Sequence, residues 1–66
     1  MKIIVNGENQ EITANCTAAG LIRLLQLDTS KIAMEVNREI LPKSTFENHT
    51  FNEGDSVEIV RAIGGG

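Results

Sequence analysis

The sequence predicts an α+β domain, in which one helix covers one face of a small mixed sheet and a flexible C-terminal glycine tail follows. Three observations predict it. A β-branched segment at residues 2–5 precedes the hairpin dipeptide Asn6-Gly7. Residues 18–25 carry apolar side chains at helical spacing, and residues 56–60 alternate as a strand does. We therefore expect one domain at residues 1–60 and a tail at residues 61–66.

The first expected element is a hairpin. Asn and Gly both tolerate the positive φ of a tight turn, so the chain should return through residues 8–12. Alternation places Ile3 and Val5 on one face, where Ile12 can join them. That face should belong to the core.

The expected helix spans residues 18–25. Thr17 is a good N-cap residue, and Leu21, Leu24 and Leu25 recur at i, i+3 and i+4. We expect this leucine stripe to lie on the sheet.

The middle of the chain predicts two further strands. Apolar and other residues alternate over residues 32–36, and a turn separates them from the brief segment 39–41. Pro42 ends that segment and cannot donate to a sheet ladder, which favours an edge position. Residues 43–50 are expected to be mainly loop.

The last expected strand, residues 56–60, follows a turn at residues 52–55. Its alternation turns Val57 and Ile59 to the core and Val60 outward. The tail follows directly.

Composition excludes several classes of function. The net charge of -3 would repel a phosphate backbone, so nucleic acid is not expected as a partner. Cys16 is the only cysteine, and no Cys/His cluster offers the ligands of a metal site. Neither a signal peptide nor an apolar run of membrane-spanning length is visible, which predicts a cytoplasmic protein that binds no membrane.

The three terminal glycines, Gly64, Gly65 and Gly66, are the main candidate site. Ordering them costs entropy and buries nothing, so the fold has little use for them. Without Cβ atoms they can pass through a narrow channel and present an unhindered carboxylate at Gly66. A carboxylate is a poor acyl donor until another protein activates it with ATP. The alternative interpretation is a frayed end without function.

Three segments together resemble the ubiquitin-like, or β-grasp, family, and within it the sulfur carriers of the ThiS type. The resemblance covers the whole chain, in the order Ile-Ile-Val-Asn-Gly at residues 3–7, Val-Asn-Arg-Glu-Ile-Leu-Pro at residues 36–42, and Gly-Asp-Ser-Val-Glu-Ile-Val at residues 54–60 leading to the glycines. A third glycine follows the usual Gly-Gly pair, so the reactive position carried over is Gly66.

The resemblance implies a carrier that binds no cofactor and is not an enzyme. An adenylyltransferase related to ubiquitin activators (the ThiF type) would adenylate Gly66, using ATP. Sulfur supplied indirectly by a cysteine desulfurase would then convert it to a thiocarboxylate, from which thiazole synthase (the ThiG type) takes sulfur for the thiamine thiazole. Alternatives are the small subunit of molybdopterin synthase, a ubiquitin-like protein modifier joined to lysines through Gly66, and a binding module with an idle tail.

Residues beside the glycines suggest how a partner would dock. If Val57 and Ile59 face the core, then Val60 and Ala62 point outward and, with Ile63, form an apolar patch next to the tail. Ile4 also points outward, because its neighbours Ile3 and Val5 face the core, and it is expected to add to this apolar patch. Scattered exposed aliphatic residues would be the alternative interpretation. The arginines Arg38 and Arg61 could pair with an acidic partner.

Other chemically active side chains are better explained without a function. Cys16 precedes the helix, where it could carry a persulfide, but a partly buried apolar role is preferred. His49 has no spaced partner and is interpreted as a surface histidine. Glu47, Glu53 and Asp55 are assigned to turns and solvation as readily as to acid–base chemistry.

Overall fold

The computed structural model describes residues 1–61 of the 66-residue chain. The elements follow in the order β1 (Lys2–Val5), β2 (Glu8–Glu11), α1 (Ala18–Leu24), β3 (Ile32–Val36), β4 (Glu39–Leu41) and β5 (Ser56–Arg61). Short 3₁₀ turns span Thr29–Lys31 and Lys43–Thr45. No helix in this part of the chain is long and apolar enough to cross a membrane.

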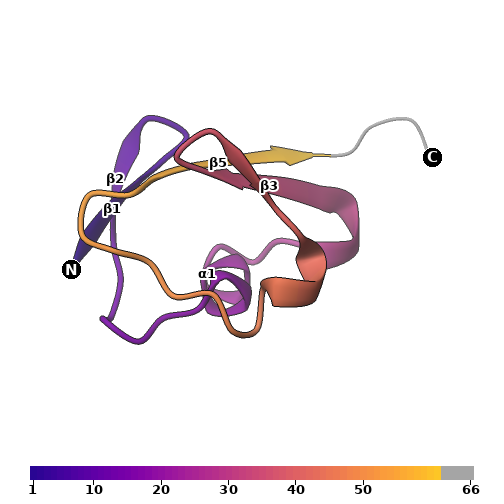
Figure 1. Ribbon diagram of the computed structural model, residues 1–66, viewed down its shortest axis with the longest axis horizontal. Helices are drawn as coiled ribbons and strands as arrows, with labels where there is room; N and C mark the ends of the chain where they lie inside the picture. The colour runs from indigo at the N-terminus through magenta and orange to yellow at the C-terminus, as the bar shows by residue number, and fades with distance from the viewer. Residues whose placement is uncertain (62–66) are drawn as a thin grey trace.

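The five strands form one mixed sheet in the order β2-β1-β5-β3-β4 (Figure 1). β1 pairs with β2 antiparallel and with β5 parallel, while β3 pairs antiparallel with both β4 and β5. The last of the described strands, β5, therefore lies in the middle of the sheet. The predicted hairpin is confirmed, and β4 lies at the edge, as Pro42 predicts.

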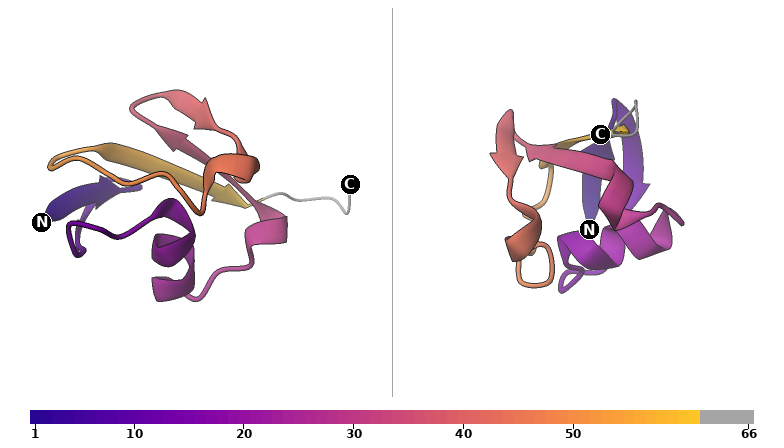
Figure 2. Two further views of the ribbon diagram at one scale, coloured as in Figure 1. Left: turned by 60° about the horizontal axis from the view of Figure 1, so that its bottom comes forward. Right: turned by 90° about the vertical axis from the view of Figure 1, so that its right-hand side faces the viewer.

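Helix α1 covers one face of the sheet, and within residues 1–61 no helix covers the other face (Figure 2). Thr17 caps it as predicted, because its hydroxyl oxygen accepts a hydrogen bond from the Gly20 amide at 3.1 Å. The predicted leucine stripe is partly wrong, since Leu24 is 55% exposed. Ile22 takes its place in the core beside Leu21.

The segment between β4 and β5 supplies two core residues that the pattern did not indicate: Phe46, within the predicted loop at residues 43–50, and Phe51, directly after it. This segment is held to the start of α1, because the amides of Ala18 and Ala19 donate to the carbonyl oxygens of His49 and Phe46. Those are among the first amides of the helix, which have no partner within it. The loop thus closes the side of the core that the sheet leaves open.

The buried core lies between the sheet and α1 and consists largely of aliphatic side chains. Its remaining members are Ile3, Ile12, Ala18, Ala19, Leu21, Ile32, Met34 and Val57. Ile3, Ile12 and Val57 were predicted there. β5 extends one residue beyond the predicted end, because Arg61 pairs with Ile32 of β3.

Candidate functional site

The candidate site begins at the end of β5. Val60 lies on the outward face opposite Ala33 of β3 and is 58% exposed, which confirms its predicted orientation. Arg61 is the last described residue and is exposed. The other predicted site residues lie outside the described residues: Ala62, Ile63, Gly64, Gly65 and Gly66.

Asn6 holds the C-terminal half of β5 in place. Its backbone has a φ of 50°, in the left-handed region that the β1–β2 turn requires. Its side-chain oxygen accepts from the Ile59 amide at 2.8 Å, and its side-chain nitrogen donates to the Ile59 carbonyl oxygen at 3.2 Å. The turn signal Asn6-Gly7 predicts the hairpin but does not indicate this contact with a distant strand.

Asn37 makes a similar contact at the beginning of β5. Its φ is 51°, and its side-chain oxygen accepts from the Ser56 amide at 3.0 Å. Its side-chain nitrogen donates to Asp55 at 3.1 Å, and the other oxygen of that buried carboxylate accepts from the Asn52 amide at 2.9 Å. The predicted turn role of Asp55 is confirmed.

The outward face of the sheet carries several uncovered aliphatic side chains. Ile4 is half-buried and lies in register with Ser56 of β5. Ile40, on the edge strand, is 77% exposed. Glu35 and Glu58 lie between Ile40 and Val60 on this face, so Val60 is the exposed aliphatic residue nearest along the chain to the predicted tail.

Cys16 and His49 do not form a reactive pair. Cys16 is half-buried against the core, and its Sγ lies 3.4 Å from the Thr17 carbonyl oxygen, as the preferred interpretation required. His49 is not the plain surface residue expected: within the described residues its Nε2 is buried without a hydrogen-bond partner, and its ring packs edge-on against Phe51. In residues 1–61 no group of three or more His, Cys, Asp or Glu side chains could hold a metal ion.

The remaining acidic candidates have local structural contacts. Glu53 accepts from the Lys2 amide at 3.0 Å, beside the turn that precedes β5. Glu47 lies 3.7 Å from Arg23, with both side chains exposed. These contacts agree with turn and surface roles.

The sheet order and the single covering helix define the class of protein as a ubiquitin-like β-grasp domain. Comparison with known proteins places the chain within that class. The model of the ThiS family matches residues 3–66, and the chain belongs to this family.

Three relatives illustrate the similarity. The crystal structure of a thiamine biosynthesis protein (ThiS) from Geobacter metallireducens superimposes with a TM-score of 0.86 at 28% identity, over the whole of both chains. The Escherichia coli sulfur carrier protein ThiS is 26% identical over the full length of both. A thiazole synthase of Paramagnetospirillum magneticum is 44% identical over all of this chain, which spans only 20% of that relative's length.

Proposed function

We propose that this member of the ThiS family is a sulfur carrier for thiamine biosynthesis and that it carries the sulfur on the carboxylate of Gly66. Membership of the family is the observation that supports the carrier role. The chain itself would supply no catalytic groups. It would be the substrate of enzymes that act on its last residue.

The chemistry expected of Gly66 has three steps. A carboxylate oxygen attacks the α-phosphorus of ATP, and pyrophosphate leaves, giving an acyl adenylate. The terminal sulfur of a persulfide then displaces AMP and forms an acyl disulfide, and a thiol that attacks the other sulfur of the S–S bond releases the thiocarboxylate and is itself left in a disulfide. Activation is necessary because a free carboxylate is a poor acyl donor. Gly64 and Gly65 would give the backbone the small cross-section that a narrow active site requires.

The domain would dock through Val60, Ala62 and Ile63. The exposure of Val60 beside the last described residue supports this role, because an apolar side chain in that position can be covered by a partner. An adenylyltransferase of the ThiF type is one expected partner. The cysteine desulfurase would act only indirectly, as the source of sulfur.

Thiazole synthase is the second expected partner. Two relatives that carry this name contain a stretch similar to the whole chain, which spans about a fifth of their length. A carrier-like stretch within a protein of that name supports a functional link between carrier and enzyme. It also favours the thiazole pathway over the molybdopterin and protein-modifier alternatives.

The decisive test compares the full chain with a variant that lacks Gly66. We expect both to fold with the same free energy of unfolding, while only the full chain supports ATP–pyrophosphate exchange with the activating enzyme. Equal exchange by the shortened variant would refute the role of Gly66.

Intact-mass analysis of the protein recovered from cells provides an independent check. The proposal requires a species that ends at Gly66 and is heavier by the difference between one sulfur and one oxygen atom. A native product that continues beyond Gly66 would contradict a free carboxylate there.

A further inference from the structure

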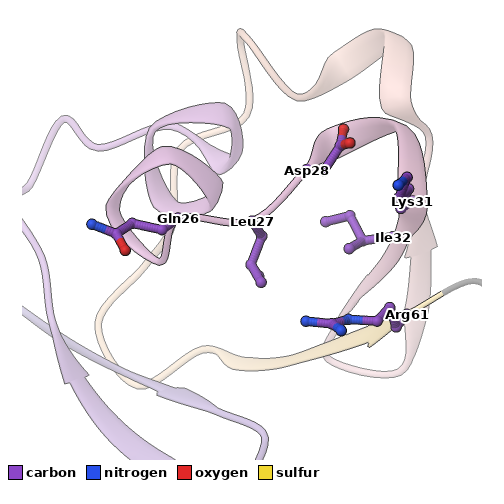
Figure 3. A pocket seen from close by; sticks show the side chains of 6 residues that line it. All are labelled: Gln26, Leu27, Asp28, Lys31, Ile32 and Arg61. Carbon is purple, nitrogen blue, oxygen red and sulfur yellow. The ribbon is translucent and has the colours of Figure 1, made fainter.

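A groove lies at the end of β5, on the face of the sheet opposite to Val60. It consists of two adjoining hollows of about 240 and 200 Å³, both lined by Leu27, Ile32 and Arg61. We call it the tail-root groove and define it by its lining: an apolar floor of Val5, Leu25, Leu27, Ile32 and Ile59, and a rim of Asp28, Lys31 and Arg61. Figure 3 shows one of the two hollows, between the end of α1 and β5.

The floor of the groove is apolar and only partly covered. Val5, Leu25, Leu27 and Ile59 are partly buried and pack against the core, and Ile32 belongs to the core itself. Such a surface gains free energy when another apolar side chain removes it from water. A hollow of about 200 Å³ has room for one aliphatic side chain.

The end of α1 fixes this floor rigidly. Gln26 adopts a φ of 59°, and its amide donates to the Arg23 carbonyl oxygen. The amide of Leu27 donates to the Ile22 carbonyl oxygen at 3.0 Å. These two bonds are those of a Schellman motif, which ends the helix and holds the following residue against it. Leu27 is therefore positioned before any partner arrives.

The rim of the groove is cationic. Lys31 and Arg61 line it, and neither forms an ion pair within residues 1–61. The one carboxylate in the lining, that of Asp28, already accepts from the Ser30 amide at 3.0 Å and the Ser30 hydroxyl at 2.8 Å. In Figure 3 the Arg61 guanidinium lies below Leu27, and the Asp28 carboxylate lies at the far side of the hollow.

We propose that the tail-root groove binds a segment of a partner protein that presents a carboxylate next to an aliphatic side chain. The aliphatic side chain would fill the hollow over Leu27 and Ile32. The carboxylate would receive two parallel hydrogen bonds from Arg61, whose planar guanidinium matches its geometry. The charge of the rim selects this acidic occupant, although the chain as a whole carries a net charge of -3.

This site goes beyond the proposed docking patch. Successive residues of a strand point to opposite faces, so Val60 and Arg61 present opposite sides of the end of β5. A partner that occupied both sides would hold the strand immediately before Ala62. The groove would thereby set the direction in which the following residues enter the partner.

The test is an NMR titration of the isotope-labelled chain with a small probe, N-acetyl-leucyl-glutamate amide. We expect saturable shifts of the Leu27, Ile32 and Arg61 amides. The isosteric probe N-acetyl-leucyl-glutamine amide should bind about tenfold more weakly, because it lacks the charge-assisted hydrogen bonds. Arg61→Gln should abolish that difference between the probes, and the matched control Arg23→Gln, whose exposed side chain pairs with Glu47, should preserve it.

Four outcomes would overturn the proposal: no shift of the groove amides, equal binding of both probes, the same shifts with acetate alone, or shifts that grow with protein concentration without a probe. Equal binding would indicate a merely apolar hollow. Acetate alone would indicate a bare anion site, and concentration dependence would indicate a second copy of the chain. The titration needs neither ATP nor Gly66, so its outcome is independent of the carrier chemistry.

Discussion

At the scale of single residues, Asn6 combines a strained backbone with two long-range hydrogen bonds to Ile59. We predict that Asn6→Ala lowers the free energy of unfolding by about 2–3 kcal/mol, since each lost hydrogen bond contributes about 1 kcal/mol and a left-handed alanine adds about 1 kcal/mol of strain. Urea denaturation measures this change. Asn6→Gly is the matched control, because glycine tolerates the positive φ and loses only the hydrogen bonds. Equal destabilisation by both substitutions would show that the backbone is not strained.

The structure lowers the pKa of Asp28. Its pKa lies below the usual 3.8, first because the Ser30 hydroxyl donates to its carboxylate, and then because the Ser30 amide does so. A carboxyl whose pKa is lowered on folding stabilises the fold above pH 3.8, and this contribution is lost as the pH falls through the lowered pKa. Stability falls as the pH is lowered because the carboxyl of Asp28 binds its proton more tightly in the unfolded chain than in the folded one.

We predict that Ser30→Ala raises the pKa of Asp28 toward 3.8, and that the remaining amide bond keeps it below that value. Carboxyl carbon NMR shifts, followed from neutral to acid pH, measure the midpoint. Ser44→Ala, in the exposed second 3₁₀ turn, is the control and should leave the midpoint unchanged. A midpoint unaffected by Ser30→Ala would assign the lowering to a cause other than the hydroxyl.

At the scale of elements, α1 contains two leucines with opposite environments: Leu21 is fully buried and Leu24 is 55% exposed. We predict that Leu21→Ala lowers the free energy of unfolding by about 2–5 kcal/mol through lost burial and the cavity left behind. Leu24→Ala should change it by no more than about 0.5 kcal/mol, since exposed positions contribute little. Denaturation of the two variants under one set of conditions makes the comparison. Similar losses would mean that the helix packs through the leucine stripe first expected.

The elements themselves could be predicted because their signals are local. Asn6-Gly7 marks the hairpin, Thr17 marks the helix start, and alternation marks β3 and β5. The face of α1 could not be assigned with the same success, because Leu21 can share a buried face either with Leu24, three residues later, or with Ile22, its neighbour, and a helix of seven residues offers too few turns to decide. Phe46 was missed because it enters the core from an irregular segment without periodicity.

For the candidate site, the sequence could predict only which face of the sheet a side chain points to, because side chains alternate between the two faces along a strand. The outward position of Val60 follows from the inward position of Val57. The tail-root groove has no such signal, because Leu27 and Arg61 meet only when the end of α1 lies over β5. The contact of Asn6 with Ile59 likewise depends on which strand becomes the neighbour of β1.

At the scale of the whole molecule, the central position of β5 connects the fold to the proposed function. β1 and β3 flank this strand on its two sides, and Asn6 and Asn37 fasten it near its end and at its beginning. Figure 1 shows β5 running away from the side of the N-terminus toward the opposite end of the molecule. A strand that is paired on both sides therefore carries the residues that precede Ala62, and it would give a partner a rigid reference for docking.

The last prediction concerns the outward face as a docking surface. Val60→Gln should weaken binding to the activating enzyme about tenfold or more, because removing a central apolar contact from an interface commonly costs more than 1 kcal/mol. The stability of the free domain should change by less than about 0.5 kcal/mol, since Val60 is mostly exposed. Ile40→Gln is the matched control: Ile40 is more exposed still, but it lies on the edge strand β4, away from the end of β5. Calorimetric titration of each variant into the enzyme separates the possibilities. Equal weakening by both substitutions would mean that the partner covers the whole outward face. If only Ile40→Gln weakened binding, the docking surface would lie at the sheet edge, and the patch beside residues 62–66 would be excluded.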